Sequence, residues 1–203
     1  GLRTLVEACR RLEKAGRKPP RIGMFYDTST LQHNRAGFHA DLATPEGREW
    51  LYLSVRDFYS LIPPDLWATI EGRPLVWLYS AAFAKRQDAT ALDELRAAFE
   101  RDFGCQPFIV KEVSWQGQAD ASYAWGAALE PKLHGVLAVG PGYDHRAVPG
   151  RTPLVRAREG GDFYRRSWEW GLRQDPATRP SIAIVETWNE FHEGTEIAPT
   201  KEH

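Results

Sequence analysis

Apolar residues recur along the chain at two spacings, and the alternation between these spacings predicts the fold. Leu92, Leu95 and Phe99 fall on one face of a helix, whereas residues 135–139 form a short apolar run typical of a buried strand. Gly104 follows the third predicted helix, in the position that glycine favours beyond a helix end. The pattern predicts helices at 2–12, 46–62, 88–103, 120–129 and 160–172, and strands at 22–26, 74–80, 107–110, 135–139 and 181–187.

Strands that alternate with helices predict an α/β protein, because such connections place parallel strands side by side with helices covering them. A doubly wound sheet and a (β/α) barrel both fit this order. The glycines at 140–142 do not form a dinucleotide-binding turn, since Pro141 and Tyr143 interrupt the pattern. Five strands cannot close an eight-stranded barrel. We therefore expect the later part of a TIM-type (β/α)8 barrel whose N-terminal strands are missing.

No repeat or interdomain linker interrupts the pattern, so residues 1–203 are predicted to form a single, partial barrel domain. A helical pattern starts directly at Gly1, and a motif-rich segment runs to His203 without a closing element. We therefore expect the chain to be a piece of a longer protein.

Composition narrows the possible functions. The chain has 26 basic and 27 acidic residues, and a net charge of −1 gives no electrostatic basis for binding nucleic acid. The longest apolar stretches are too short to cross a bilayer. Cys9 and Cys105 lack metal-ligand spacing, and no metal or other cofactor is expected. Eight Trp, seven Tyr and nine Phe favour a carbohydrate partner, because these rings stack on sugars.

Polar and aromatic residues follow the predicted strands, where both candidate architectures place their active sites. A cap or turn, or helix packing, would also explain each of these residues. The candidates for substrate binding at these positions are Tyr26, Asp27, Trp115, Tyr123, Trp125, Tyr143 and Asp144.

The strongest candidates for catalysis are Glu190 and Glu193, which lie three residues apart just beyond the last predicted strand. If the chain turns helically there, both carboxylates project to one side. Two nearby carboxylates can differ in pKa, so that one acts as an acid and one as a base, as glycoside hydrolysis requires. Asn189 and His192 could orient them, and Trp188 could form a wall of the site. The alternative is a solvated acidic loop.

The segment Trp188-Asn-Glu-Phe-His-Glu-Gly-Thr-Glu-Ile197 resembles the Asn-Glu-Trp-x-Glu-Gly-Thr motif of glycoside hydrolase family 99 and its bacterial relatives. The segment Val139-Gly-Pro-Gly-Tyr-Asp144 is also similar to a segment of that family. The resemblance is strong over residues 135–199 and topological before them. The family contains endo-α-mannosidases and endo-α-mannanases on a (β/α)8 barrel. Phe191 stands where the family usually has Trp.

The resemblance implies that Glu193 is the general acid/base and that Glu190 acts as a base on the sugar 2-hydroxyl. It thus implies a retaining, endo-acting glycosidase for an α-mannan-like glycan, working through a 1,2-anhydro sugar. We expect such a protein to be secreted, periplasmic or on the cell surface.

Three other interpretations stay open at the level of sequence. The change at Phe191 and the missing strands are compatible with a glycan-binding barrel module that has lost catalysis. A domain of this kind could also belong to a polysaccharide-biosynthesis protein. In a different barrel glycosidase, Asn189-Glu190 would carry the acid/base and Glu112 would supply a distant nucleophile.

Overall fold

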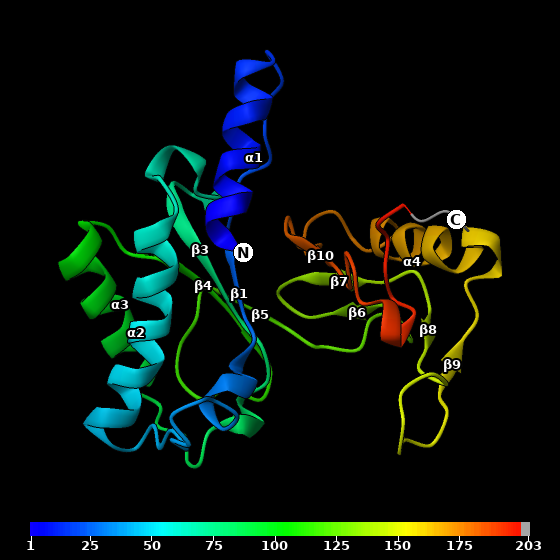
Figure 1. Cartoon of the computed structure of the whole chain (residues 1–203). Helices are drawn as coiled ribbons and strands as arrows, with labels where there is room; N and C mark the ends of the chain where they lie inside the picture. Colours follow the sequence, from blue (N-terminus) through cyan, green and yellow to red (C-terminus); the bar gives the residue numbers. More distant parts are fainter. Residues whose placement is uncertain (200–203) are drawn as a thin grey trace. The chain divides into compact units, whose positions relative to one another are not determined.

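The computed structural model describes residues 1–199, and the chain divides into two compact units, Gly1–Ala121 and Ser122–His203. Strands of both units pair in parallel, which confirms the predicted α/β class (Figure 1). The prediction of a single domain over residues 1–203 stays a prediction. No helix within residues 1–199 is long and apolar enough to cross a membrane.

The first unit contains a parallel sheet flanked by two long helices (Figure 1). Its strands run in the order β1-β3-β4, and β2 pairs antiparallel with β3. Strand β5, which follows β4 in this order, begins at Ala121, the last residue of the unit. The core buries apolar residues of the strands, such as Val76 and Ile109, with Leu51 and Phe99 of the helices. The elements are α1 (Leu2–Lys14), β1 (Met24–Tyr26), η1 (Thr28–Leu31), α2 (Pro45–Leu61), η2 (Pro64–Leu66), β2 (Thr69–Ile70), β3 (Arg73–Leu78), η3 (Ala81–Phe83), α3 (Ala91–Phe103), β4 (Phe108–Glu112) and β5 (Ala121–Tyr123).

The helix ends follow from local sequence. The Thr44 hydroxyl accepts a hydrogen bond from the Gly47 amide at 3.2 Å, and Pro45 occupies the first helical position of α2. Helix α3 ends at Gly104, which has a left-handed φ of 72°. The glycine-terminated third helix predicted from the sequence is therefore confirmed.

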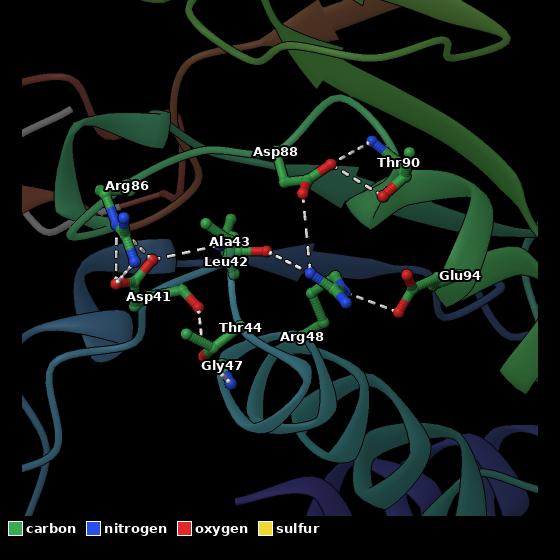
Figure 2. Close-up of polar contacts among 10 residues, drawn as sticks. All are labelled: Asp41, Leu42, Ala43, Thr44, Gly47, Arg48, Arg86, Asp88, Thr90 and Glu94. Carbon is green, nitrogen blue, oxygen red and sulfur yellow. Dashed lines mark hydrogen bonds and ion pairs between the residues drawn. The ribbon is translucent and has the colours of Figure 1, made fainter.

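Two loops that follow β1 and β3 are tied together by arginines (Figure 2). Arg86 donates to both carboxylate oxygens of Asp41, at 3.0 and 2.8 Å, and the Leu42 amide donates to the Arg86 carbonyl at 3.0 Å. From α2, Arg48 donates to the Leu42 carbonyl at 3.0 Å and to Glu94 of α3 at 2.6 Å. These contacts join the two strand-end loops to each other, and they connect the start of α2 to the first loop and to α3.

The second unit has a smaller sheet with a hairpin and one helix. In the order β10-β7-β6, β10 and β7 are parallel, and β8 pairs antiparallel with β9. Helix α4 packs closely on β7, because a Cβ at Gly171 would lie only 2.4 Å from a methyl carbon of Leu137. The elements are β6 (Lys132–Leu133), β7 (Leu137–Val139), β8 (Tyr143–Asp144), β9 (Val155–Arg156), η4 (Glu159–Gly161), α4 (Asp162–Leu172), β10 (Ala183–Val185) and η5 (Phe191–Glu193).

All five predicted strands and four of the five predicted helices occur, but the predicted helix at 120–129 is wrong. Residues of this segment form β5 and a loop instead. The Asp120 carboxylate accepts hydrogen bonds from the Ile109 amide at 2.8 Å and from Arg73 at 2.7 Å. The Asp120 amide also donates to the Ile109 carbonyl at 2.9 Å, so tertiary contacts hold this residue alongside β4.

Candidate active site

The segment 187–198, which we call the carboxylate loop, follows β10 and folds back on itself. The Thr187 amide donates to the Thr195 carbonyl at 2.9 Å, and the Ile197 amide donates to the Thr187 carbonyl at 3.0 Å. The two threonine hydroxyls are 2.8 Å apart. Between these bonds lies the single 3-10 turn η5, with Glu190 as its N-cap and Glu193 as its last residue. A short helical turn therefore lies between the two glutamates and starts directly after Glu190.

Glu193 is partly buried and has charged and polar neighbours within the second unit. Its side chain is 26% exposed, and Arg151 donates to Oε1 at 3.0 Å. Burial raises the pKa of Tyr143, and the nearby Glu193 carboxylate raises it further. The arrangement brings Tyr143, Arg151 and Glu193 together.

A buried histidine forms a hydrogen bond with Tyr143. His145 is buried, and its Nε2 lies 2.8 Å from the Thr152 carbonyl oxygen, which can only accept a hydrogen bond. Nε2 therefore donates to this carbonyl. The Tyr143 hydroxyl lies 2.8 Å from Nδ1. The same hydroxyl interacts with the Glu193 carboxylate, so Tyr143 lies between His145 and Glu193.

A glycine brings the carboxylate loop against β8. Gly194 has a φ of +59°, and a Cβ there would lie 3.2 Å from the backbone nitrogen and oxygen of Asp144. The Asp144 carboxylate accepts hydrogen bonds from Arg146, which lower its pKa to about 2. Asp144 therefore carries a negative charge beside the loop.

The remaining predicted residues of the loop face outward. Trp188 and Phe191 are 62% and 56% exposed, and Asn189, Glu190 and His192 are also exposed. The Glu190 amide donates to the Thr187 hydroxyl at 3.3 Å, and the Glu190 carbonyl accepts from the Thr195 amide at 3.2 Å. The loop thus fixes the Glu190 backbone and leaves its carboxylate accessible.

Glu186, the residue before the carboxylate loop, is a buried carboxylate that the sequence did not single out. It is 2% exposed and accepts hydrogen bonds from the Gly126 amide at 3.0 Å and the Ala128 amide at 3.4 Å. Burial raises its pKa to about 7. The sequence feature that could have identified Glu186 is an acidic residue at the end of an apolar strand. Glu186 fastens the turn after Trp125 to the end of β10.

Three predicted substrate-binding residues belong to the first unit. Tyr26 is buried and its hydroxyl donates to Ser54 at 3.0 Å, while the Asp27 carboxylate accepts from the Ser29 amide at 3.1 Å and caps η1. Trp115 is 4% exposed, and its indole nitrogen donates to a backbone carbonyl. Packing and capping explain these three residues without a ligand.

In the second unit, Tyr123 is fully buried and Trp125 is half-buried.

The alternative nucleophile Glu112 lies at the end of β4 in the first unit. It is 8% exposed, and its carboxylate accepts from the Ser114 amide at 2.8 Å and from the Ser114 hydroxyl. Within residues 1–199 no group of three or more His, Cys, Asp or Glu side chains could hold a metal ion.

Comparison with known proteins supports the resemblance to family 99. The chain is 38% identical over 63 residues to the glycoprotein endo-α-1,2-mannosidases of Rattus norvegicus and Mus musculus. This stretch is 30% of the chain and 13% of each mannosidase. The chain therefore matches only a small part of these curated relatives.

Solved structures share the fold. The GH99 endo-α-mannosidase of Bacteroides thetaiotaomicron aligns with 98% of the chain and 70% of its own length, at 17% identity and a TM-score of 0.56. A glycoside hydrolase-like protein aligns with 92% of the chain and 66% of its own length, at 14% identity and a TM-score of 0.65. The chain thus shares the fold of these proteins.

A family model matches the whole chain, residues 1–203. The chain therefore belongs to the family described as a domain of unknown function, DUF5010.

Proposed function

We propose that the chain is the catalytic part of a retaining glycoside hydrolase that cuts within an α-mannan-like glycan. The observation that carries this proposal is the carboxylate loop, in which one 3-10 turn holds Glu190 and Glu193 at its two ends. Both glutamates lie on a loop beyond a parallel strand, the position where enzymes with such sheets carry their catalytic residues. This position supports a paired role for the two carboxylates.

In the proposed first step, Glu193 gives its proton to the leaving glycosidic oxygen. Glu190 removes the proton of the sugar 2-hydroxyl, whose oxygen attacks C1 as the bond to the leaving group breaks. The product is a 1,2-anhydro sugar.

In the second step, Glu193 takes a proton from a water molecule that attacks C1. The bond from C1 to O2 then breaks, and O2 recovers its proton from Glu190. Two inversions at C1 give overall retention.

The other side chains of the site have roles in sugar binding under this proposal. Trp188 and Phe191 offer exposed aromatic faces to a sugar ring. Hydrogen bonds to hydroxyl groups would come from Tyr143, Asp144, Asn189 and His192, with Trp125 at the edge of the site. The predicted contacts of Tyr26, Asp27, Trp115 and Tyr123 with substrate stay predictions.

The proposal extends to architecture and location. The parallel pairs β1-β3-β4 and β7-β10 are consistent with the later part of a (β/α)8 barrel, whose remaining strands would come from elsewhere in a longer protein. A polysaccharide substrate agrees with a secreted, periplasmic or cell-surface protein.

The test is to incubate the full-length protein with α-mannans and other bacterial polysaccharides, and to identify products by mass spectrometry. Glu190→Gln and Glu193→Gln should each abolish release of oligosaccharides without unfolding the protein. Glu130→Gln, an exposed glutamate of the same unit, is the matched control and should stay active. Proton NMR of the first-formed anomer would show retention.

Unchanged activity in both glutamine variants would rule out the proposed chemistry. Binding of a polymer without cleavage, equal in wild type and Glu193→Gln, would instead identify a glycan-binding module.

A further inference from the structure

Arg158 reaches into the carboxylate loop from the segment between β9 and η4. Its Nη2 donates to the Gly194 carbonyl at 3.0 Å and to the Glu196 carbonyl at 2.8 Å. The same nitrogen pairs with the Glu196 carboxylate at 2.7 Å. The Arg158 side chain is 30% exposed and that of Glu196 is 10% exposed, so water screens these contacts only in part.

The backbone of the loop explains why a donor is needed there. The Thr195 carbonyl is used inside the loop, where it accepts from the Thr187 amide. The carbonyls of Gly194 and Glu196, on either side of Thr195, accept from Arg158 instead. A partly buried carbonyl without a donor destabilises a fold. Arg158 supplies donors to both.

Arg158 is itself fixed to the body of the unit. Its carbonyl accepts from the Gly161 amide at 2.9 Å and the Phe163 amide at 3.3 Å, at the start of α4. Its aliphatic stem lies against Gly142, since a Cβ there would be 2.9 Å from Arg158 Cγ. Because α4 packs on β7, Arg158 connects the carboxylate loop to the helix and sheet of the unit.

We propose that Arg158 is a positioning residue for Glu193: by holding the carbonyls of Gly194 and Glu196, it fixes the backbone that carries the Glu193 carboxylate. This inference rests on the proposed function for its effect on catalysis. The guanidinium of Arg158 bonds to residues that follow Glu193, so its action passes through the backbone.

The first arm of the test does not depend on activity. Hydrogen exchange is measured at the amides of Gly194, Thr195 and Ile197 in wild type, Arg158→Ala and Arg158→Lys. We expect at least tenfold faster exchange in Arg158→Ala. Arg158→Lys should give an intermediate rate, because lysine keeps a charged donor on a flexible stem but lacks the planar guanidinium. Arg166→Ala is the matched control, since Arg166 forms a similarly close but exposed ion pair with Glu159.

Glu196→Gln separates the ion pair from the carbonyl contacts. It removes the negative charge and leaves both carbonyl acceptors in place, so exchange in the loop should stay within threefold of wild type. If Arg158→Ala does not fold, Arg158→Lys and Glu196→Gln still provide the comparison.

The second arm measures cleavage of α-mannan by the full-length protein. A misplaced catalytic group lowers turnover by up to about 100-fold, so Arg158→Ala should lose 10- to 100-fold in kcat with KM changed less than threefold. Added guanidinium at millimolar concentration should restore part of the kcat of Arg158→Ala and leave wild type unchanged.

Loop exchange that is equal in wild type and Arg158→Ala would overturn the inference, and so would equal acceleration in Arg166→Ala. A KM effect with unchanged kcat would also overturn it. Wild type that cleaves no glycan would refute the proposed function alone, because the exchange arm would still test the role of Arg158 in holding the loop.

Discussion

The buried carboxylate of Glu186 makes the stability of the protein depend on pH in a defined direction. Its pKa lies near 7 in the folded chain, against a usual value of 4.5, chiefly because burial disfavours the charged form. The Gly126 and Ala128 amides and the charge of Lys132 oppose this shift. The folded state therefore binds a proton more tightly at this group than the unfolded state does.

The sign and size of the effect follow from this difference. The stabilising contribution of the protonated group is fully present below about pH 4.5 and is lost as pH rises through about 7. A difference of about 2.5 pKa units corresponds to about 3 kcal/mol. Glu186→Gln has no proton to lose at this position, so its free energy of unfolding lacks this pH-dependent contribution.

Urea denaturation of wild type and Glu186→Gln between pH 4.5 and 8 tests the prediction. The unfolding free energy of wild type, relative to the variant, should fall by about 3 kcal/mol across this range. Glu130→Gln gives the baseline for removing an exposed carboxylate of the same unit. Parallel curves for wild type and Glu186→Gln, or a difference that grows with pH, would refute the reasoning.

Two further predictions concern a glycine and an arginine. Gly194→Ala should destabilise the protein by about 1–2 kcal/mol and lower glycan cleavage, because its φ is positive and the Cβ meets the Asp144 backbone; Gly104→Ala, with a similar φ and open space around its Cβ, should keep full activity in the same assay. Arg48→Met should lower the unfolding free energy by about 1–3 kcal/mol in urea, because the Leu42 carbonyl and Glu94 lose a partly buried partner; a loss no larger than that of Arg56→Met, which breaks an exposed pair with Asp57, would contradict this.

The sequence predicted the elements whose formation depends on local pattern. Continuous apolar runs marked the parallel strands, and Gly104 marked the end of α3. The segment after Asp120 was mispredicted because alanines and a tyrosine suit either a helix or a strand there. Its conformation is decided by Arg73 and by the Ile109 backbone, which are distant in sequence.

In the candidate site, too, local features could be predicted from the sequence and contacts between distant segments could not. The spacing of Glu190 and Glu193 predicted their shared turn, since that turn is formed by neighbouring residues. The Arg158 contacts and the burial of Glu186 join segments that no local pattern relates. They could be found only from the three-dimensional structure.

The closure of the carboxylate loop on itself separates two properties that enzymes often change together. Bonds between Thr187 and the Thr195–Ile197 segment hold together the two ends of the loop that carries Glu190 and Glu193. Trp188 and Phe191 project from the same loop and are largely exposed, so little of the packing depends on them. Under the proposed function, substitutions at these two aromatic positions would alter which glycan is bound and leave the backbone of the two glutamates unchanged. Related proteins could then differ in substrate and share one reaction.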